Sequence, residues 1–164
     1  MANITLKGNP IKTMGTLPAV GSKAPDFHLV KRDLSESTIN QYKGKTKILN
    51  IVPSFDTKTC ALSAKQFHAK IKKRDDVVLI NISMDLPFAQ DRFCKAEGLD
   101  EEFLSGFRST FPKDYGVEIL DGPIKGLLSR AVVLLDKDNK VLYTEQVPEI
   151  SQEPNYEAVL KHLL

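Results

Sequence analysis

Two cysteines, Cys60 and Cys94, are the side chains of this sequence best suited to nucleophilic or redox chemistry. Cys60 ends the stretch Pro-Ser-Phe-Asp-Thr-Lys-Thr-Cys at residues 53–60, which follows an apolar run at 47–52. That run predicts a buried strand because it is short, apolar and followed by a proline. The segment at 60–71 predicts a helix, since its apolar residues recur at intervals of four, three and four and share one face. They are Cys60, Ala64, Phe67 and Ile71.

The predicted position of Cys60 has a chemical consequence. Thr57 and Thr59 stand where N-cap residues belong, so Cys60 falls in the first turn of the helix, just past a central strand. The unpaired backbone N–H groups and the positive dipole end of that turn favour a thiolate over a thiol. An inert core cysteine is the alternative, because free cysteines are often buried. The residues around Cys60 favour the reactive interpretation.

Other kinds of cysteine site fit the sequence poorly. Neither cysteine has a second cysteine three residues away, so a Cys-x-x-Cys motif is absent. The cysteines and the three scattered histidines lack the spacing of zinc ligands, and we expect no metal and no cofactor. A cysteine hydrolase would need a histidine beside Cys60, but His68 lies about 12 Å further along the same helix at 1.5 Å per residue. His28 and His162 stay open as partners.

Length and composition suit one domain over residues 1–164, with 41% hydrophobic and 27% charged residues. A net charge of +2, with its densest basic cluster at a helix end, gives little support for nucleic-acid binding. The N-terminus lacks a signal-peptide pattern, and no stretch approaches the roughly 18 apolar residues of a membrane span. We therefore expect a cytoplasmic protein with reduced thiols, which argues against a permanent disulfide between Cys60 and Cys94.

The elements that must position Cys60 form a βαβ unit. A second apolar run at residues 77–82 predicts a strand covered on both faces, so residues 48–82 form strand, helix and strand with a right-handed crossover. A third apolar run at 130–135, a turn and an alternating stretch at 141–147 predict an antiparallel hairpin. We therefore expect an α/β fold with a central mixed sheet and helices on both faces.

Weaker signals place the rest of the chain. Residues 1–14 contain two alternating runs around Gly-Asn-Pro, which predict an N-terminal β-hairpin. Residues 99–115 predict only loop and short turns, and residues 153–164 predict a closing helix.

The second cysteine lies in a predicted helix at residues 85–98. Asp85 can cap this helix and Gly98 can terminate it. Cys94 is expected on the flank of the apolar stripe, where it can be inert or available for reaction. The stripe consists of Ala89, Phe93 and Ala96.

These residues together resemble the peroxiredoxins, and within them the bacterial thiol peroxidase branch. The family pattern Pro-x-x-x-Thr/Ser-x-x-Cys is matched by Pro53, Thr57 and Cys60, and its arginine at the start of a later strand by Arg130. The branch also has an N-terminal hairpin, a second cysteine in the helix after the next strand, here Cys94, and an Asp-Gly-Pro-x-Lys-Gly-Leu segment before the arginine. The resemblance covers essentially the whole chain and implies a thioredoxin-like fold.

The resemblance implies a thiol-specific peroxidase that reduces hydrogen peroxide and alkyl hydroperoxides to water and alcohols in antioxidant defence. It implies that Cys60 is the peroxidatic cysteine, which is oxidised to a sulfenic acid. It also implies that Cys94 is the resolving cysteine, which forms an intrachain disulfide with Cys60. Thioredoxin as reductant and a homodimer are further implications.

A lowered thiol pKa cannot alone supply the speed of such an enzyme. Lowering a cysteine pKa from about 8.5 to about 6 raises the thiolate fraction at pH 7 about 30-fold. The accompanying loss of nucleophilicity costs about 13-fold at a Brønsted slope near 0.45, which leaves about twofold. The rest must come from holding the peroxide and stabilising its leaving oxygen. The expected donors are the Thr57 hydroxyl, the Cys60 N–H and Arg130, with Pro53 shielding the site.

Plainer interpretations remain for these residues: an N-cap for Thr57, a surface ion pair for Arg130, a strand end for Pro53 and a bystander thiol for Cys94. Two other functions share the same motif, a redox relay that passes its disulfide to a partner and a non-catalytic thioredoxin-fold binding module.

Disulfide formation sets a geometric demand, because two cysteines bond only when their Cα atoms come within about 7 Å. We therefore expect the first turn around Cys60, or the helix around Cys94, to unwind on oxidation.

Overall fold

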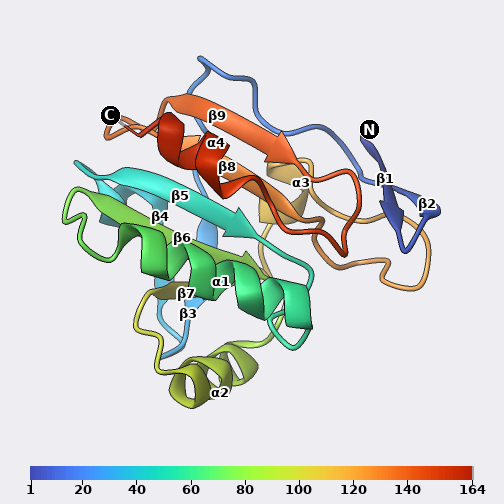
Figure 1. Cartoon of the computed structure of the whole chain (residues 1–164), viewed down its shortest axis with the longest axis horizontal. Coiled ribbons are helices and arrows are strands. Elements are labelled where there is room, and N and C mark those ends of the chain that lie inside the picture. The colour runs from blue at the N-terminus through green and yellow to red at the C-terminus, as the bar shows by residue number, and fades with distance from the viewer. Residues whose placement is uncertain (164) are drawn as a thin grey trace.

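The computed structural model describes residues 1–163 and contains a main sheet, a separate two-stranded sheet and flanking helices (Figure 1). The strands are β1 (Asn3–Leu6), β2 (Asn9–Lys12), β3 (His28–Lys31), β4 (Glu36–Thr38), β5 (Thr46–Ile51), β6 (Val77–Ser83), β7 (Glu102–Ser105), β8 (Ala131–Leu135) and β9 (Val141–Gln146). The helices are α1 (Lys58–Ile71), α2 (Pro87–Glu97), α3 (Phe111–Asp114), α4 (Tyr156–Lys161) and the 3₁₀ helix η1 (Ile39–Tyr42).

The main sheet has seven strands in the order β4-β3-β7-β6-β5-β8-β9 and is mixed, as the sequence predicts. At its centre β5 and β6 run parallel, joined by α1, and Ile51 pairs with Ile82 at the end of their ladder. On the other side of β5, β8 is antiparallel and continues into antiparallel β9. The predicted βαβ unit and the hairpin that follows the third apolar run are both confirmed.

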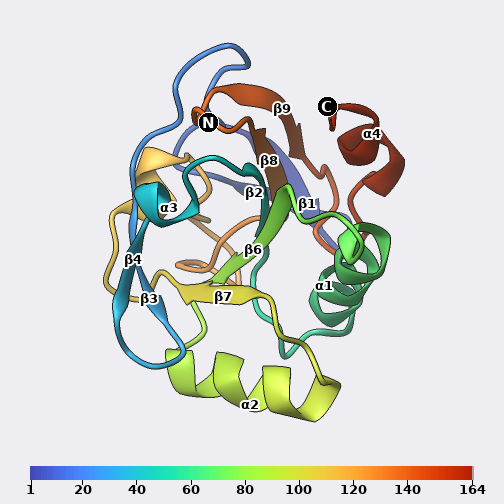
Figure 2. The same ribbon diagram turned by 90° about the vertical axis from the view of Figure 1, so that its left-hand side faces the viewer.

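Helices cover both faces of the main sheet, which explains why its central strands are apolar on both sides. Figure 2 shows α1 on one side and α3 on the other. In β5, Ile48 packs in the cluster that includes Phe67 of α1, whereas Leu49 packs in the cluster that includes Phe111 of α3. The alternation of side chains along one strand thus divides the core in two.

The N-terminal hairpin is confirmed and lies apart from the main sheet. Its strands β1 and β2 pair antiparallel through Ile4 and Ile11, both buried. The two-residue turn is formed by Lys7 and Gly8, with φ of 50° and 82°. Positive φ at both central residues is the type I′ pattern of short hairpins. The hairpin is held by bonds between Lys12 and residues 120–121 and by contacts to the chain after β9, which are described below.

Residues 99–115 contain a strand that the sequence analysis does not predict. β7 pairs parallel with β6 and antiparallel with β3, so it lies inside the sheet. It has only four residues, of which Phe103 and Leu104 are apolar and face opposite clusters. Ser105 is buried, and its hydroxyl is satisfied because it donates to the Asp85 carbonyl oxygen. The expectation of loop was wrong because tertiary pairing, rather than local pattern, makes this strand.

Helix α2 exists as predicted, but its expected cap and buried face were wrong. Leu86, not Asp85, is the N-cap residue, and no side-chain cap bond forms there. Gly98 ends the helix in the left-handed conformation, as predicted. The buried residues of α2 are Pro87, Gln90 and Cys94, so the cysteine lies at the centre of the packed face.

Two helix ends also differ from the sequence prediction. Helix α1 ends at Ile71 rather than near residue 74. The closing helix, α4, is shorter than the predicted 153–164, and residue 164 lies outside the described residues.

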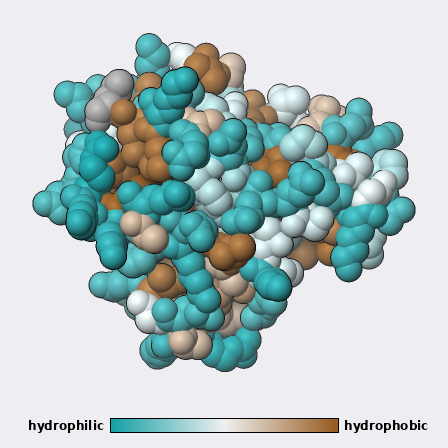
Figure 3. All heavy atoms as spheres, in the orientation of Figure 1, coloured by the Kyte–Doolittle hydropathy of each residue, from teal (hydrophilic) through white to brown (hydrophobic). Residues whose placement is uncertain are grey.

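Polar side chains dominate the face shown in Figure 3, with apolar surface in separate patches between them. Among residues 1–163, no helix is long and apolar enough to cross a membrane.

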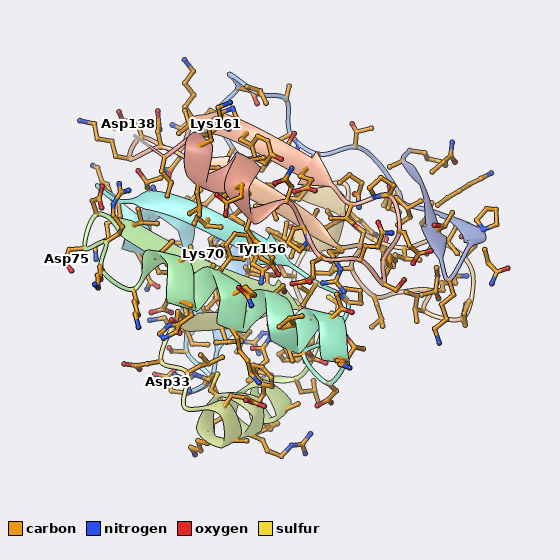
Figure 4. The ribbon with its side chains drawn as sticks, in the orientation of Figure 1. Asp33, Lys70, Asp75, Asp138, Tyr156 and Lys161 are labelled. Atoms are coloured by element: carbon orange, nitrogen blue, oxygen red, sulfur yellow. The ribbon has the colours of Figure 1, made fainter. Side chains whose placement is uncertain are left out.

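Helix α1 is held against α4 by an aromatic contact, and this contact gives a stability prediction. The Phe67 and Tyr156 rings pack edge-on with their centroids 4.9 Å apart, and Lys70 of α1 lies beside Tyr156 (Figure 4). We expect Phe67→Ala to lower the free energy of unfolding by about 3–5 kcal/mol, measured by urea denaturation. Gln66→Ala, at a partly exposed position of the same helix, should change it by less than about 0.5 kcal/mol. A loss no larger than that of the control would contradict the packing argument.

Candidate active site

Cys60 lies in the first turn of α1, as predicted, and its side chain is fully buried. Its polar neighbour is Arg130, whose Nη2 lies 3.2 Å from Cys60 Sγ. Arg130 directly precedes β8 and is 2% exposed, so the guanidinium meets the sulfur away from solvent. A cation in such surroundings stabilises negative charge on sulfur far more than it would in water.

Arg130 is oriented by a contact from a distant segment. Its Nε donates to the Ile150 carbonyl oxygen at 2.7 Å. The remaining nitrogen, Nη1, is buried and has no hydrogen-bond partner among the described residues. The guanidinium is thus fixed at two points and retains one unpaired donor. Because an unpaired buried donor is costly, this nitrogen is suited to an oxygen of a bound ligand.

Thr57 is the N-cap residue of α1 by its extended backbone, as predicted, but its side chain makes no cap bond. Its hydroxyl instead donates to the Ser54 carbonyl oxygen at 2.9 Å. With its proton engaged, the Thr57 oxygen is left as an acceptor. The side chain is exposed and lies at the mouth of the site.

A cavity of about 380 Å³ joins these residues. Pro53, Thr57 and Arg130 line it, so the structure brings three of the predicted site residues together beside buried Cys60. The other walls come from the N-terminal hairpin, the loop before Arg130 and the loop after β9. They include Leu6, Lys7, Ile124, Leu127, Ile150 and Ser151. Sequence reasoning missed these residues, since none lies near the cysteine motif in the chain.

Asp85 shapes the loop that leads to Cys60, a role that sequence reasoning also missed. Its carboxylate accepts hydrogen bonds from the Ser54 hydroxyl at 2.6 Å and the Phe55 N–H at 2.8 Å. It also accepts from the Ser83 hydroxyl at 2.7 Å, and the buried Gln90 side chain of α2 donates to that same hydroxyl oxygen. Asp85 therefore links the Cys60 loop to the helix that carries Cys94.

Cys94 is 1% exposed and belongs to the same apolar cluster as Cys60, and both thiols are free. Three aromatic rings pack in that cluster. The centroid of the Phe55 ring lies 5.0 Å from that of Phe103 and 5.5 Å from that of Phe93. Burial raises the pKa of the Cys94 thiol to about 11. In this conformation Cys94 is therefore a neutral, enclosed thiol and a poor nucleophile.

The histidines do not make a hydrolase dyad. His68 pairs with Glu101, and His162 contacts the Ala158 carbonyl oxygen and the Tyr143 ring. His28 is an exposed residue of β3. Over residues 1–163, no group of three or more potential metal-ligating side chains gathers.

The protein-family model described as Redoxin matches residues 19–160 of the chain. The chain is 53% identical to the thiol peroxidase of Mycobacterium tuberculosis, with 99% of both chains covered. It is 50% identical to the thiol peroxidase of Leptospira interrogans, with 98% of this chain and 96% of that protein covered.

Solved structures agree with this relationship. The peroxiredoxin-like protein from Aquifex aeolicus matches with a TM-score of 0.90 at 39% identity and covers 99% of this chain and 96% of its own. The thiol peroxidase from Chromobacterium violaceum shares the fold with a TM-score of 0.91 at 24% identity, over 97% of this chain and 93% of its own. The chain therefore belongs to the redoxin family, in the thiol peroxidase branch of the peroxiredoxins.

Proposed function

We propose that Cys60 is the peroxidatic cysteine of a peroxiredoxin-type peroxidase and that Cys94 resolves it. The observation that carries this proposal is the 3.2 Å contact between Arg130 Nη2 and Cys60 Sγ at a buried helix start. A core cysteine without chemistry would not need a buried cation beside it, because burying a guanidinium is costly.

The reaction balances in three steps. The Cys60 thiolate attacks one peroxide oxygen, so an S–O bond forms, the O–O bond breaks, and the departing oxygen takes a proton and leaves as water or alcohol. The product is a Cys60 sulfenic acid. Cys94 sulfur then attacks the Cys60 sulfur, which forms the disulfide and releases water. A dithiol reductant, which we propose is thioredoxin, returns both residues to thiols and is itself oxidised to a disulfide.

The site offers complementary groups for both peroxide oxygens. The unpaired Nη1 of Arg130 is a donor to the oxygen on which negative charge develops. The sequence predicts Thr57 as a donor to the peroxide, and in the structure its hydroxyl donates to the Ser54 carbonyl oxygen. Its oxygen instead accepts the peroxide O–H and so orients the substrate. Pro53 closes the cavity over the start of α1.

The walls of the cavity support organic hydroperoxides as substrates beside hydrogen peroxide. Leu6, Ile124, Leu127 and Ile150 give the cavity apolar walls. The polar side chains of the lining are those of Lys7, Thr57, Lys58, Thr59, Arg130 and Ser151. An alkyl group buried there gains about 0.8 kcal/mol per CH₂ removed from water.

Resolution requires Cys94 to leave its packed position. Helix α2 is held by the Phe55, Phe93 and Phe103 contacts and by Gln90, which donates to the Leu104 carbonyl oxygen. We propose that α2 unwinds after Cys60 is oxidised, which exposes Cys94 and lowers its pKa toward the ordinary value.

We propose cytoplasmic antioxidant defence as the setting and a homodimer as the assembly. The dimer is supported by exposed apolar side chains in the neighbouring segments that follow β6 and β7, among them Phe88 at 67% exposure. The others are Leu86 and Phe107.

Cysteine substitutions test the two roles directly. Reduced wild type should consume one equivalent of hydrogen peroxide rapidly and lose both thiols, whereas Cys60→Ser should lose none. Cys94→Ser should accumulate a sulfenic acid that dimedone traps, measured by mass spectrometry. Thioredoxin, thioredoxin reductase and NADPH should then sustain turnover of wild type alone. A Cys60 no faster than free cysteine would favour the binding module, and a stable mixed disulfide with slow turnover would favour the redox relay.

The role of Arg130 is tested by removing its charge. We expect Arg130→Gln to slow sulfenic acid formation by about 10²–10³, as for loss of one transition-state donor. Arg130→Lys should recover only part of that rate, because an ammonium cannot reach Ile150 oxygen and Cys60 sulfur together. Arg108→Gln, which removes an exposed arginine paired with Glu36, is the control. Equal stopped-flow rates for all variants would exclude the proposed role.

Burial of Cys94 predicts an unusual pH profile for its labelling in Cys60→Ser. Because the folded state predominates, labelling follows the folded-state pKa of about 11 even when α2 must open first. The rate with a thiol reagent should therefore rise about tenfold per pH unit up to pH 10, whereas in urea it should level off near 8.5. Cys94 also binds its proton more tightly when folded, so it should lower stability as pH rises from about 8.5. A plateau near pH 8.5 without urea would mean that Cys94 is already exposed.

A further inference from the structure

The loop after β9 carries a carboxylate that joins it to the N-terminal hairpin. Glu149 Oε1 accepts hydrogen bonds from the Thr5 hydroxyl at 2.9 Å and the Gly8 N–H at 2.8 Å. Its Oε2 accepts from the Lys7 N–H at 3.1 Å and from the Ser151 N–H and hydroxyl at 2.8 and 2.6 Å. One side chain thus binds the hairpin turn and its own loop at once.

The backbone around Glu149 continues the same junction. Thr5 N–H donates to the Pro148 carbonyl oxygen at 2.7 Å, and Ile150 N–H donates to the Thr5 carbonyl oxygen at 2.9 Å. The Lys7 backbone holds a positive φ that costs a non-glycine residue about 1–2 kcal/mol. In this conformation the amides of Lys7 and Gly8 both point at the carboxylate. The turn geometry and the Glu149 contacts therefore support one another.

This junction forms one wall of the peroxide cavity. Leu6 and Lys7 of the hairpin and Ile150 and Ser151 of the loop all line it. The hairpin is separate from the main sheet, and three sets of contacts place it: the bonds of this junction, the bonds of Lys12 to Leu120 and Asp121, and a small apolar cluster around Ile4. The junction is the set that holds the turn, at Lys7 and Gly8, beside the cavity.

We propose that Glu149 is a positioning residue that holds the hairpin as the wall of the peroxide cavity and so sets the preference for organic hydroperoxides over hydrogen peroxide. The inference rests on the proposed role of Cys60 and deepens it. Hydrogen peroxide needs only the polar groups of Arg130 and Thr57. A bulky hydroperoxide also needs the apolar wall, and its binding weakens when that wall moves.

The ionised carboxylate of Glu149 supplies the acceptors of this junction. Hydrogen bonds from the Ser151 hydroxyl and N–H and from the Gly8 N–H hold the pKa of Glu149 well below its usual range. The contribution of a depressed carboxyl pKa to stability is present above the unfolded pKa and is lost only as pH falls through the folded one. The carboxylate therefore keeps both acceptors at every pH near neutrality.

The test compares two substrates in Glu149→Gln. The amide NH₂ of glutamine faces N–H donors where the second carboxylate oxygen accepted, so the junction loses its bonds on that side. We expect kcat/KM for cumene hydroperoxide to fall about tenfold more than kcat/KM for hydrogen peroxide, with the loss in KM rather than kcat. Glu157→Gln, an exposed carboxylate on α4 that pairs with Lys70, is the matched control. In the variant, amide hydrogen exchange at Lys7 and Gly8 should become faster than in wild type.

A double-mutant cycle with Leu6→Ala provides a second measurement. Leu6→Ala removes the wall directly. The kcat/KM for cumene hydroperoxide should therefore fall about as much in Leu6→Ala as in Glu149→Gln, and it should fall little further in the double variant. If Glu149→Gln lowered kcat/KM equally for both peroxides, Glu149 would act through Arg130. If the losses in the two single variants added up in the double variant, Leu6 and Glu149 would act independently. Either result overturns the inference. Failure of wild type to consume peroxide would instead overturn the proposed function.

Discussion

The contact between Arg130 and Cys60 is the interaction on which the site depends, and it constrains the rest of the fold. Burying a guanidinium is costly, so two of its nitrogens are met by partners and the unpaired Nη1 is available to a ligand. The Ile150 carbonyl oxygen meets Nε, and Cys60 sulfur meets Nη2. The two residues come from α1 and the start of β8, which lie beside each other because β5, before α1, pairs with β8. The central sheet thus places the charge beside the nucleophile.

In the structure Cys60 lies beside Arg130 whereas Cys94 is enclosed among apolar side chains. Cys94 is buried with its pKa raised, and Asp85 connects the loop before Cys60 to Gln90 of α2. The packing that would support attack of Cys60 on a peroxide therefore opposes the proposed attack of Cys94 on oxidised Cys60. The proposed mechanism is therefore met by two conformations, one with α2 packed and one with α2 unwound. The ion pairs that α2 makes are on the surface and contribute little, as for Arg92 and Asp56 at 3.8 Å, so the aromatic contacts and Gln90 set the cost of opening.

The sequence predicts those parts of the site that are encoded locally. Strand, proline, threonine and helix start follow one another along residues 47–60, so period and capping rules place Cys60 correctly. The same rules do not predict β7, because four residues with two apolar side chains show no distinctive period. This strand forms through its pairing with β3 and β6. Asp85 was misassigned as a cap because sequence position shows which backbone amides are near, but not that Phe55 N–H is nearer in space. The residues that form the cavity walls come from three distant segments. The sequence predicts the hairpin and singles out the 121–127 segment, but nothing in it shows that these segments meet beside Cys60.

The hairpin separates recognition from chemistry. None of its residues contacts Cys60 or Arg130 through a hydrogen bond of the described chain, yet Leu6 and Lys7 line the cavity. The hairpin reaches the buried charge through Ile150, whose N–H donates to the Thr5 carbonyl oxygen and whose own carbonyl oxygen accepts from Arg130 Nε. The Arg130 backbone is held separately, because its carbonyl oxygen accepts from the Val147 N–H. Glu149 is the residue through which the two parts meet, since its neighbour Ile150 binds Arg130 while its carboxylate binds the turn. A change at this junction therefore reaches the buried guanidinium through Ile150, one residue further from Cys60 than a change at Arg130 itself.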